Sequence, residues 1–582
     1  MKLSNILATG VIVAFAGLVS SCVDKDPDYA NYPNPDVDFA YEVDGDEYKT
    51  DYYVVSTIKF TNTSSKSGAI SWDFGDGTTS TDPNPTHKFD KAGVYKVTLT
   101  IDEVGSQTYP ILIYDIVPIL SIAEKSSEIV YYNDTEVKLG LELPNPENLR
   151  VKYVWKFPDG TLDKNGDEIS EFVGYAESDG SVQMPENLRF RNIGSQKIEI
   201  SSWFDVDGEN RRLEDAYLNV QVGTKEPAPT LYYAQQKGNI KALKLLDVIP
   251  EGTKVLPFDM GVPAGNTVFN LLYGEQKETR EDETEVMQGY VYILDAGKQY
   301  YYINDEDGVL GDGQITAMRT DGTGVNTLVT NVGGAAFLDP FVGCIYNGNI
   351  YYSDRNTGVT SRPLTARGEV EGKISSSQRD SYVFQNNTIS YYGRGMSYGA
   401  ISSSLYRDSK GYWWWGKKFN GEGIFRFNDS QIYADQKTAD SNPVPGPVLL
   451  SGMKATCFGV DETRKALYVW RRSPSPGFLV YPLPAGISDG LDEKAFTKYI
   501  AMDATAVNTT ESEGLFTTQF AIDPANGRVY FCFRPEAGGT APAGITAGIV
   551  YYDPADQQMH NYGTTTDLGT GIVINPNKTE LF

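Results

Sequence analysis

Hydrophobic and polar positions alternate in short runs along most of this chain. In Trp72–Phe74 two large apolar side chains flank an aspartate, and Ala466–Trp470 is an apolar run rich in aromatic and branched residues. Such runs are separated by short groups of Gly, Pro, Asn and Asp, which are typical of turns. No amphipathic pattern of helical period is sustained after residue 23. The pattern therefore predicts an all-β protein.

The amino terminus has the pattern of a secretory signal. An apolar run over Ile6–Val19 is too short to span a bilayer and is followed by two serines. The block Val19–Cys22 resembles a bacterial lipobox, and that resemblance implies acylation of Cys22. We therefore expect a signal peptide over 1–21 and an acidic, lipidated tether over 22–36. The alternative is an ordinary secreted protein whose cysteine at this position is unmodified.

Two sandwich domains are expected after the tether. The first, residues 37–116, contains Trp72–Thr78 and Pro85–Leu99. These two motifs resemble those of the PKD domain, an immunoglobulin-like β-sandwich that usually serves as a spacer or adhesion module. Residues Trp155–Thr161 repeat the first motif more weakly. A second PKD/Ig-like sandwich is therefore expected over 117–223.

Residues 224–582 carry a recurrent pattern of an apolar position, an aspartate, a polar turn and a Tyr-rich strand. Ile350–Asp354 and Gln314–Gly324 resemble the strand and the Asp-Gly-Thr-Gly hairpin of YWTD β-propellers. A spacing near about 50 residues indicates four-stranded blades, and the length then predicts a propeller of about seven blades. A pair of further β-sandwiches is the alternative fold. We expect the repeated aspartates to form hydrogen bonds within turns, and they are Asp354, Asp408, Asp461 and Asp523.

Charge and composition disfavour several classes of function. The formal net charge of −27 disfavours binding to nucleic acid or to anionic lipid head groups. His87 and His560 are the two histidines of the chain, so a histidine-based zinc site or catalytic triad is not expected. We expect no cofactor, no metal and no catalytic residue. The 77 Asp and Glu residues leave a carboxylate pair of the glycosidase type as the open enzymatic alternative.

Three clusters are candidate ligand-binding sites, because aromatic rings beside polar groups suit the apolar faces and hydroxyl groups of sugars. For each tryptophan the alternative is a place in the core. The clusters are Trp413, Trp414 and Trp415; Trp470, Arg471 and Arg472; and Tyr392 with Arg394.

The signal, the PKD-like motifs and the Tyr-rich β region together resemble the PKD-like surface lipoproteins of glycan-degrading gut bacteria. Those proteins are accessory to outer-membrane uptake systems of the starch-utilisation type. The resemblance implies an outer-membrane protein that faces the cell exterior, binds an oligosaccharide or glycopeptide, and works beside a transporter complex. It implies contact with the membrane through the lipid anchor only. A propeller glycoside hydrolase or lyase and a structural protein-interaction component are the alternatives.

Overall fold

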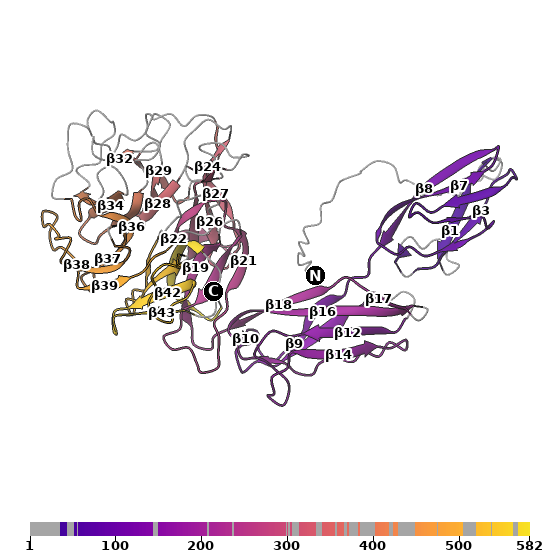
Figure 1. Ribbon diagram of the computed structural model, residues 1–582, viewed down its shortest axis with the longest axis horizontal. Helices are drawn as coiled ribbons and strands as arrows, with labels where there is room; N and C mark the ends of the chain where they lie inside the picture. Colours follow the sequence, from indigo (N-terminus) through magenta and orange to yellow (C-terminus); the bar gives the residue numbers. More distant parts are fainter. Residues whose placement is uncertain are drawn as a thin grey trace.

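The computed structural model shows a chain built from β-strands (Figure 1). The elements assigned in the described residues are all β-strands, which confirms the prediction of an all-β protein. Within this described part, no helix is long and apolar enough to cross a membrane. The described residues are 35–43, 52–54, 56–143, 149–206, 209–235, 238–297, 299–300, 303–304, 313–332, 340–354, 358–365, 369–371, 382–384, 402–417, 423–428, 448–473, 475–504, 519–536, 538–562 and 569–581.

Strands β1 to β8 form two small sheets around one core. One sheet has the order β1-β3-β6 and the other the order β2-β8-β7-β4-β5. Trp72 and Phe74 are both buried, as the alternation of the sequence predicts, and the Trp72 indole donates a hydrogen bond to the Asp82 carbonyl at 3.0 Å. The strands are β1 (Phe39–Val43), β2 (Tyr52–Tyr53), β3 (Ile58–Asn62), β4 (Ile70–Asp73), β5 (Thr79–Ser80), β6 (Thr86–His87), β7 (Gly93–Ile101) and β8 (Gly105–Tyr114).

Strands β9 to β18 form a second layered unit. Its large sheet has the order β10-β18-β16-β12-β14, with β17 paired to β16, and two smaller sheets pair β9 with β11 and β13 with β15. Trp155 is fully buried here, and Tyr153 and Phe204 belong to the same core. The strands are β9 (Ile119–Lys125), β10 (Val130–Tyr131), β11 (Val137–Glu142), β12 (Val151–Lys156), β13 (Thr161–Leu162), β14 (Glu171–Ala176), β15 (Arg189–Phe190), β16 (Gly194–Val206), β17 (Glu209–Arg212) and β18 (Ala216–Gly223).

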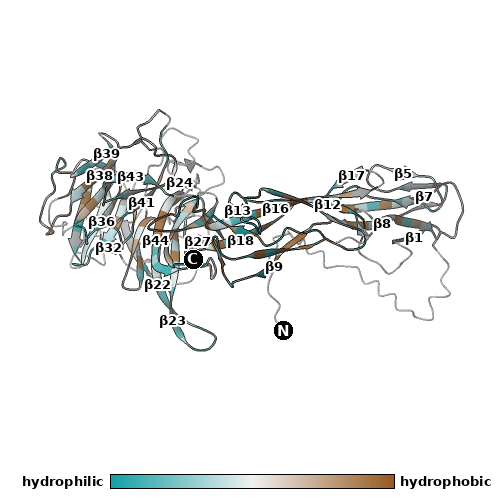
Figure 2. Ribbon diagram, turned by 90° about the horizontal axis from the view of Figure 1, so that it is seen from below, coloured by the Kyte–Doolittle hydropathy of each residue, from teal (hydrophilic) through white to brown (hydrophobic). Residues whose placement is uncertain are grey.

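Strands β19 to β44 form the head, which contains a series of small sheets, most of them built from strands consecutive in the chain. The first three orders are β21-β20-β19-β44, β22-β23-β26-β27-β31 and β28-β29-β30-β32. The next three are β33-β34-β35, β36-β37-β38-β39 and β40-β41-β42-β43. The hairpin of β22 and β23 extends well beyond its neighbours (Figure 2). The strands of the first three sheets are β19 (Ala228–Gln235), β20 (Asn239–Lys244), β21 (Phe258–Pro263), β22 (Val268–Thr279), β23 (Glu285–Asp295), β26 (Gln314–Arg319), β27 (Asn326–Val332), β28 (Pro340–Tyr346), β29 (Asn349–Asp354), β30 (Gly358–Pro363), β31 (Glu369–Glu371) and β32 (Tyr382–Phe384).

The remaining strands of the head complete these sheets. A separate two-stranded ribbon pairs β24 (Gln299–Tyr300) with β25 (Ile303–Asn304). The other strands are β33 (Ser402–Arg407), β34 (Tyr412–Lys417), β35 (Gly423–Asn428), β36 (Lys454–Asp461), β37 (Ala466–Ser473), β38 (Gly477–Pro482), β39 (Lys498–Ala501), β40 (Ala521–Ile522), β41 (Val529–Phe533), β42 (Gly548–Asp553), β43 (Gln558–Asn561) and β44 (Gly569–Thr579).

The first and last strands of the head lie in the same sheet. β44 pairs antiparallel with β19, so that Leu231 faces Ile574 and Tyr233 faces Ile572. One edge strand of each sheet contacts an edge strand of the next, in the order β44, β22, β28, β33, β36, β40 and back to β44. The six sheets therefore form a closed series, and its two ends are joined by backbone hydrogen bonds between β19 and β44.

The second layered unit is attached to the head at two separate places. The backbone N–H of Ile193 donates to the Lys254 carbonyl at 3.0 Å, and the N–H of Thr224 donates to the Glu580 carbonyl at 3.0 Å. The Tyr131 hydroxyl also donates to the Glu580 carboxylate at 2.8 Å. Because Glu580 directly follows β44, the strand that closes the head also holds the neighbouring unit.

A buried lysine lies at the junction of β19 and β44. Lys244 is fully buried, and its ammonium group donates to the Ala228 carbonyl at 2.8 Å, to Thr230 Oγ1 at 3.1 Å and to Thr579 Oγ1 at 2.8 Å. These three acceptors match the three N–H bonds of an ammonium. Burial nevertheless disfavours the charge and lowers the pKa of Lys244 from 10.5 to about 7.

The stability of the head should depend on pH through Lys244. Since its pKa is lower in the folded state than in the unfolded chain, the unfolded chain binds the proton more tightly, and raising the pH from about 7 to about 10 stabilises the fold. The slope from this one group is at most about 1.4 kcal/mol per pH unit, and Lys244→Met should lack it. Denaturant unfolding of both proteins at several pH values measures the difference. A difference that stays constant with pH would contradict the assignment.

Candidate functional site

A cavity of about 620 Å³ lies at the centre of the head. It is lined by residues of the edge strands β22, β28, β33, β36 and β44, together with residues at and beside β40. These are the strands through which neighbouring sheets contact each other. Each sheet therefore contributes one strand to the wall, and the cavity exists because the series of sheets is closed.

On β28, β33 and β36 the cavity is lined toward the carboxyl end of the strand, and on the long strand β22 it is lined by Asn270–Tyr273 in the first half. Thr463 and Pro524, which follow β36 and β40, and Pro576, near the end of β44, belong to the wall and are exposed to solvent. We call this end the mouth. It lies at the same end of β44 as Glu580, which contacts the second layered unit.

Three tyrosines form one side of the mouth. Tyr273, Tyr346 and Tyr406 come from the consecutive lining strands β22, β28 and β33. Tyr346 is 41% exposed, and the Arg407 guanidinium lies 4.1 Å from the centroid of its ring. These three residues are widely spaced in the sequence and were not predicted as a group. The signal available for two of them was a tyrosine at or next to the end of a predicted strand, just before a polar turn.

Polar groups are fixed beside these rings. Glu462 accepts hydrogen bonds from the Tyr406 hydroxyl at 2.7 Å and from the Ser409 backbone N–H at 2.9 Å. Burial opposes ionisation of Glu462, but the hydrogen bonds from Ser409 and Tyr406 outweigh it and hold its pKa below the ordinary value. On β22, the Tyr273 hydroxyl bonds both Glu275 (2.9 Å) and Asn577 (2.7 Å). The mouth thus presents aromatic rings together with oriented donors and acceptors.

Side chains tie the lining strands to one another. Asn270 Oδ1 accepts from the Gly343 N–H at 3.2 Å, and Ser404 Oγ both donates to the Phe458 carbonyl and accepts from its N–H. Gln519 bridges two strands at once: its Oε1 accepts from the N–H groups of Leu271 and Ile572, both at 2.9 Å. Neighbouring lining strands are therefore held together by side-chain hydrogen bonds as well as by packing.

The repeated aspartates form turn hydrogen bonds, as expected for three of the four. Asp408 Oδ1 accepts from the Tyr412 N–H at 2.8 Å and its Oδ2 accepts from the Trp414 indole at 2.9 Å. Asp461 accepts from the Arg464 N–H, and Asp523 accepts from the Ala525 N–H, both at 2.9 Å. Asp354 lies at the end of β29, and its side chain lies outside the described residues.

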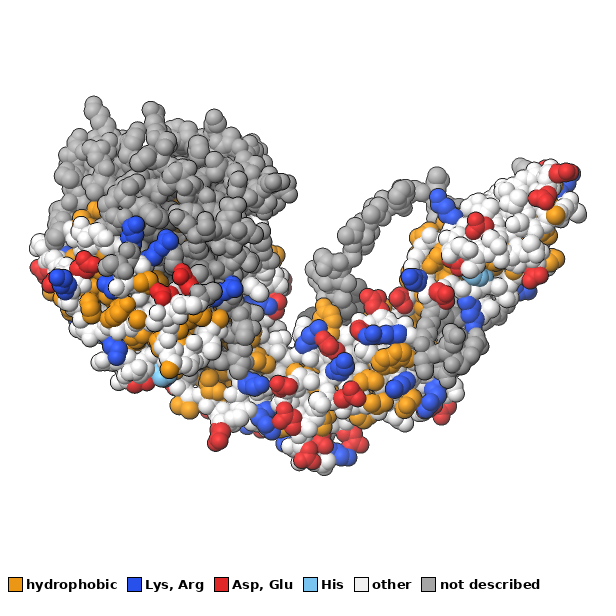
Figure 3. Space-filling model, in the orientation of Figure 1, with side chains coloured by type: hydrophobic (Ala, Val, Ile, Leu, Met, Phe, Trp, Pro, Cys, Tyr) orange, Lys and Arg blue, Asp and Glu red, His pale blue; other side chains and the backbone are white. Residues whose placement is uncertain are grey.

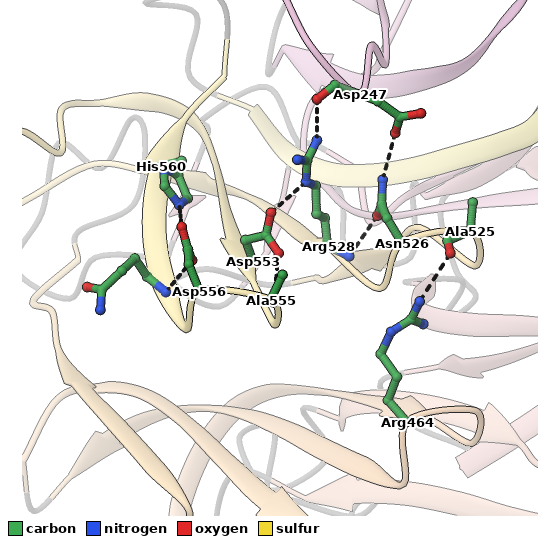
Figure 4. Close-up of polar contacts among 10 residues, drawn as sticks. Asp247, Arg464, Ala525, Asn526, Arg528, Asp553, Ala555, Asp556 and His560 are labelled. Carbon is green, nitrogen blue, oxygen red and sulfur yellow. Dashed lines mark hydrogen bonds and ion pairs between the residues drawn. The ribbon is translucent and has the colours of Figure 1, made fainter.

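Turns of neighbouring sheets also contact each other beside the mouth, as Figure 4 shows. Arg464 donates to the Ala525 carbonyl at 3.2 Å, and Asn526 and Arg528 reach Asp247 at 3.3 Å each. These contacts join the sheet of β36 to that of β40, and the sheet of β40 to that of β20. The turn needs a glycine at position 527, because its φ is +79° and a Cβ there would lie 2.2 Å from Arg464 Nε.

The four tryptophans predicted to bind ligand lie in the interior. Trp413, Trp414, Trp415 and Trp470 are at most 2% exposed. The Trp470 ring packs against Phe531 and Phe533, and Trp414 belongs to the core between β34 and β36. Side chains buried in this way do not present a ring face to solvent, so the interior alternative describes them better than a binding site does.

The other predicted site residues divide into two groups. Arg471 is 7% exposed and donates to the Ser475 carbonyl at 2.8 Å, which holds the following loop, and Arg472 is half-buried beside it. Cys22, Tyr392 and Arg394 lie outside the described residues. Among the described residues, no group of three or more His, Cys, Asp and Glu side chains could hold a metal ion.

Removing the hydrogen bonds of the Gln519 side chain should destabilise the head. Gln519→Ala leaves two strand N–H groups and the Leu271 carbonyl without this partner, and we expect the head to lose about 1–3 kcal/mol of unfolding free energy. Denaturant unfolding followed by tryptophan fluorescence measures this loss. Gln558→Ala, at an exposed position of β43, is the matched control and should change stability by less than about 0.5 kcal/mol. Equal effects of the two substitutions would contradict the role of Gln519.

Comparisons with known proteins identify the amino-terminal unit. The family model described as "PKD domain" matches residues 42–109. Among solved structures, a quinonprotein alcohol dehydrogenase-like protein from Bacteroides thetaiotaomicron is 12% identical over 78% of this chain and 98% of that chain, with a TM-score of 0.33. A DUF4784 family protein from Bacteroides caccae is 12% identical over 78% and 98% of the two chains, with a TM-score of 0.25.

A third similar structure is PorZ of Porphyromonas gingivalis, a bacterial surface component of the type-IX secretion system. It is 12% identical over 87% of this chain and 64% of its own, with a TM-score of 0.24. At such scores these likenesses carry no inference about what this chain does. The match to the family model shows that residues 42–109 of this chain form a PKD domain.

Proposed function

We propose that this protein is a lipid-anchored cell-surface protein whose head binds an oligosaccharide, free or as part of a glycopeptide, at the mouth of the central cavity. The observation that carries the proposal is the wall of the mouth, where Tyr273, Tyr346 and Tyr406 lie beside the fixed polar groups of Glu462 and Arg464. Sugars present apolar C–H faces to aromatic rings and hydroxyl groups to such donors and acceptors.

The proposal includes a six-bladed β-propeller as the architecture of the head. Its support is the closed series of six sheets, the antiparallel pairing of their strands apart from the parallel pair of β27 and β31, and the shared sheet of β19 and β44. Propellers close their ring in this way, which leaves short, protected sheet edges. The estimate of about seven blades assumed about 50 residues for each blade. In the structure the sheet that begins with β22 has five strands, and the chain also forms the separate ribbon of β24 and β25, so the same length makes fewer blades.

A binding role without catalysis fits the carboxyl groups best. Glycoside hydrolysis needs a carboxylic acid whose pKa is raised, so that it can protonate the leaving group. In the described residues, each Asp or Glu with a resolved shift has a lowered pKa, Glu462 at the mouth included. Of these groups Glu462 lines the mouth, where an ionised carboxylate can accept hydrogen bonds from sugar hydroxyls.

The proposed lipid anchor and the two amino-terminal units determine where the head lies relative to the membrane. A lipid on Cys22 would hold the chain at the outer membrane, and the PKD domain and the second layered unit would space the head from the lipid surface. The partner that fits this setting is an outer-membrane transporter complex for nutrient uptake. The net charge of −27 makes nucleic acid an unsuitable ligand.

Tyr346→Ala should weaken binding of oligosaccharide by about three- to tenfold, because a stacked ring is worth about 0.5–1.5 kcal/mol beyond its buried area. The measurement is a glycan-array screen of the soluble region 24–582, followed by calorimetry and product analysis for each ligand found. Tyr114→Ala is the matched control, since Tyr114 is also 41% exposed but lies in the PKD domain. Shorter saccharide products would show an enzyme, and an absence of any saccharide ligand would favour a structural role; either result would overturn the proposal.

Cys22→Ser should abolish lipidation and release the protein from membranes. Cells that express the full chain and are fed a labelled fatty acid should label the wild type and not the variant. Cys344→Ser is a suitable control, because Cys344 lies in β28 of the head. Label retained by Cys22→Ser would exclude the anchor proposed at this residue.

A further inference from the structure

The large sheet of the second layered unit has an outer face that combines aromatic and charged side chains. Alternation along β16 places Lys197, Glu199 and Trp203 on this face, while Ile198 and Ile200 point to the core. Figure 3 shows hydrophobic side chains interleaved with Lys, Arg, Asp and Glu side chains over this part of the molecule. Tyr217, opposite Glu199 on β18, is 63% exposed.

The aromatic residues of this face lie in rows with basic ones. One row crosses the strands β14, β12, β16 and β17 through Tyr175, Lys152, Trp203 and Arg212. Lys152 Nζ and the Arg212 guanidinium lie 5.7 and 5.9 Å from the Trp203 ring centroid. Each ring therefore has a hydrogen-bond donor beside it, which is the combination that a sugar ring with its hydroxyl groups requires.

The charges of this face compensate one another. Arg212 bonds Asp215 at 2.7 Å and Lys197 bonds Glu199 at 2.5 Å. In the same way the Arg150 side chain, which lies over the Tyr175 ring, bonds Glu177 at 2.8 Å. The face is therefore close to neutral within a chain of net charge −27. An uncharged polymer complements it, whereas a polyanion would meet both the local carboxylates and the repulsion of the whole chain.

The face is long and begins at the head. Gly194, the first residue of β16, packs so closely against the head that a Cβ there would lie 2.1 Å from the Leu256 carbonyl oxygen. Trp203 lies nine residues further along β16, about 30 Å away at about 3.3 Å per residue. Tyr217 lies between these points, about 13 Å from Trp203 by the same spacing. One or two sugar units cannot contact all of these positions.

We propose that this outer face is a second binding surface, which holds an extended, uncharged polysaccharide that also reaches the mouth of the head. The proposal rests on the proposed function, because it takes the same class of ligand. The attachment of the second layered unit to the head through Ile193 and Thr224 fixes the two surfaces relative to each other. A long chain would engage both surfaces, and a short oligosaccharide would engage the mouth alone.

The test compares ligands of different length on the soluble region 24–582. Amylopectin, mixed-linkage β-glucan and galactomannan, and the hexasaccharide of each, are measured by affinity electrophoresis and calorimetry. We expect at least one polysaccharide to bind at least tenfold more tightly than its hexasaccharide. Trp203→Ala should remove most of this gain without changing the affinity for the hexasaccharide, and Trp203→Phe should keep much of it. Tyr346→Ala should weaken binding of the hexasaccharide. Tyr114→Ala should change neither the affinity for the hexasaccharide nor that for the polysaccharide.

The outcomes separate this proposal from the proposed function. Hexasaccharide binding without a gain from length, or a gain that Trp203→Ala leaves intact, would overturn the second surface and leave the mouth standing. Binding of polygalacturonate or a single-stranded oligonucleotide that is lost in Trp203→Ala would assign the face to a polyanion and overturn it as well. If no saccharide of either length binds, both proposals fail.

Discussion

The antiparallel pairing of β19 with β44 is the interaction on which the head depends. It brings residues near position 231 against residues near position 574, and so joins the two ends of the series of sheets. Each sheet alone is small and would leave much of its apolar surface in water. Once the series is closed, every sheet packs between two neighbours, and the edge strands meet around one central cavity.

The same closure explains why the polar groups of the interior lie where they do. Gln519 can bond both Leu271 and Ile572 because closure places β22 beside β44. The Lys244 ammonium finds its acceptors on β19 and β44 together. Glu580, just beyond β44, accepts a backbone hydrogen bond from Thr224 and so attaches the second layered unit to the closed head. The cavity, the buried site of Lys244 and the attachment of the second layered unit therefore all depend on the pairing of β19 with β44.

Sequence patterns predicted the parts of this structure that depend on neighbouring residues. Alternation around Trp72 indicated a buried ring on a strand, and the turn aspartates Asp408, Asp461 and Asp523 were recognised from their place after apolar runs. Local patterns could not show that Trp470 is enclosed by Phe531 and Phe533 of the next sheet, because that contact depends on how two sheets pack.

The mouth could not be predicted for the same reason. Tyr273, Tyr346 and Tyr406 are separated by long stretches of chain and become neighbours only through the order of the sheets. An isolated tyrosine at the end of a strand is common in a chain that contains 39 of them. The tryptophan clusters drew attention because their members are adjacent in sequence, yet adjacency in a strand sends side chains to opposite faces, and both faces of β34 are covered.

Amide hydrogen exchange on the soluble region 24–582, with and without a bound oligosaccharide, tests the closed head most directly. If β44 closes the ring, its amides and those of β19 should exchange together, at the slow rate of the strands in the other sheets. The ligand should then slow exchange around Tyr273 in β22 and at the ends of β28 and β33. Fast exchange of β44 while the other sheets stay protected, or a ligand effect confined to parts of the chain away from these positions, would contradict a closed ring with its binding site at the mouth.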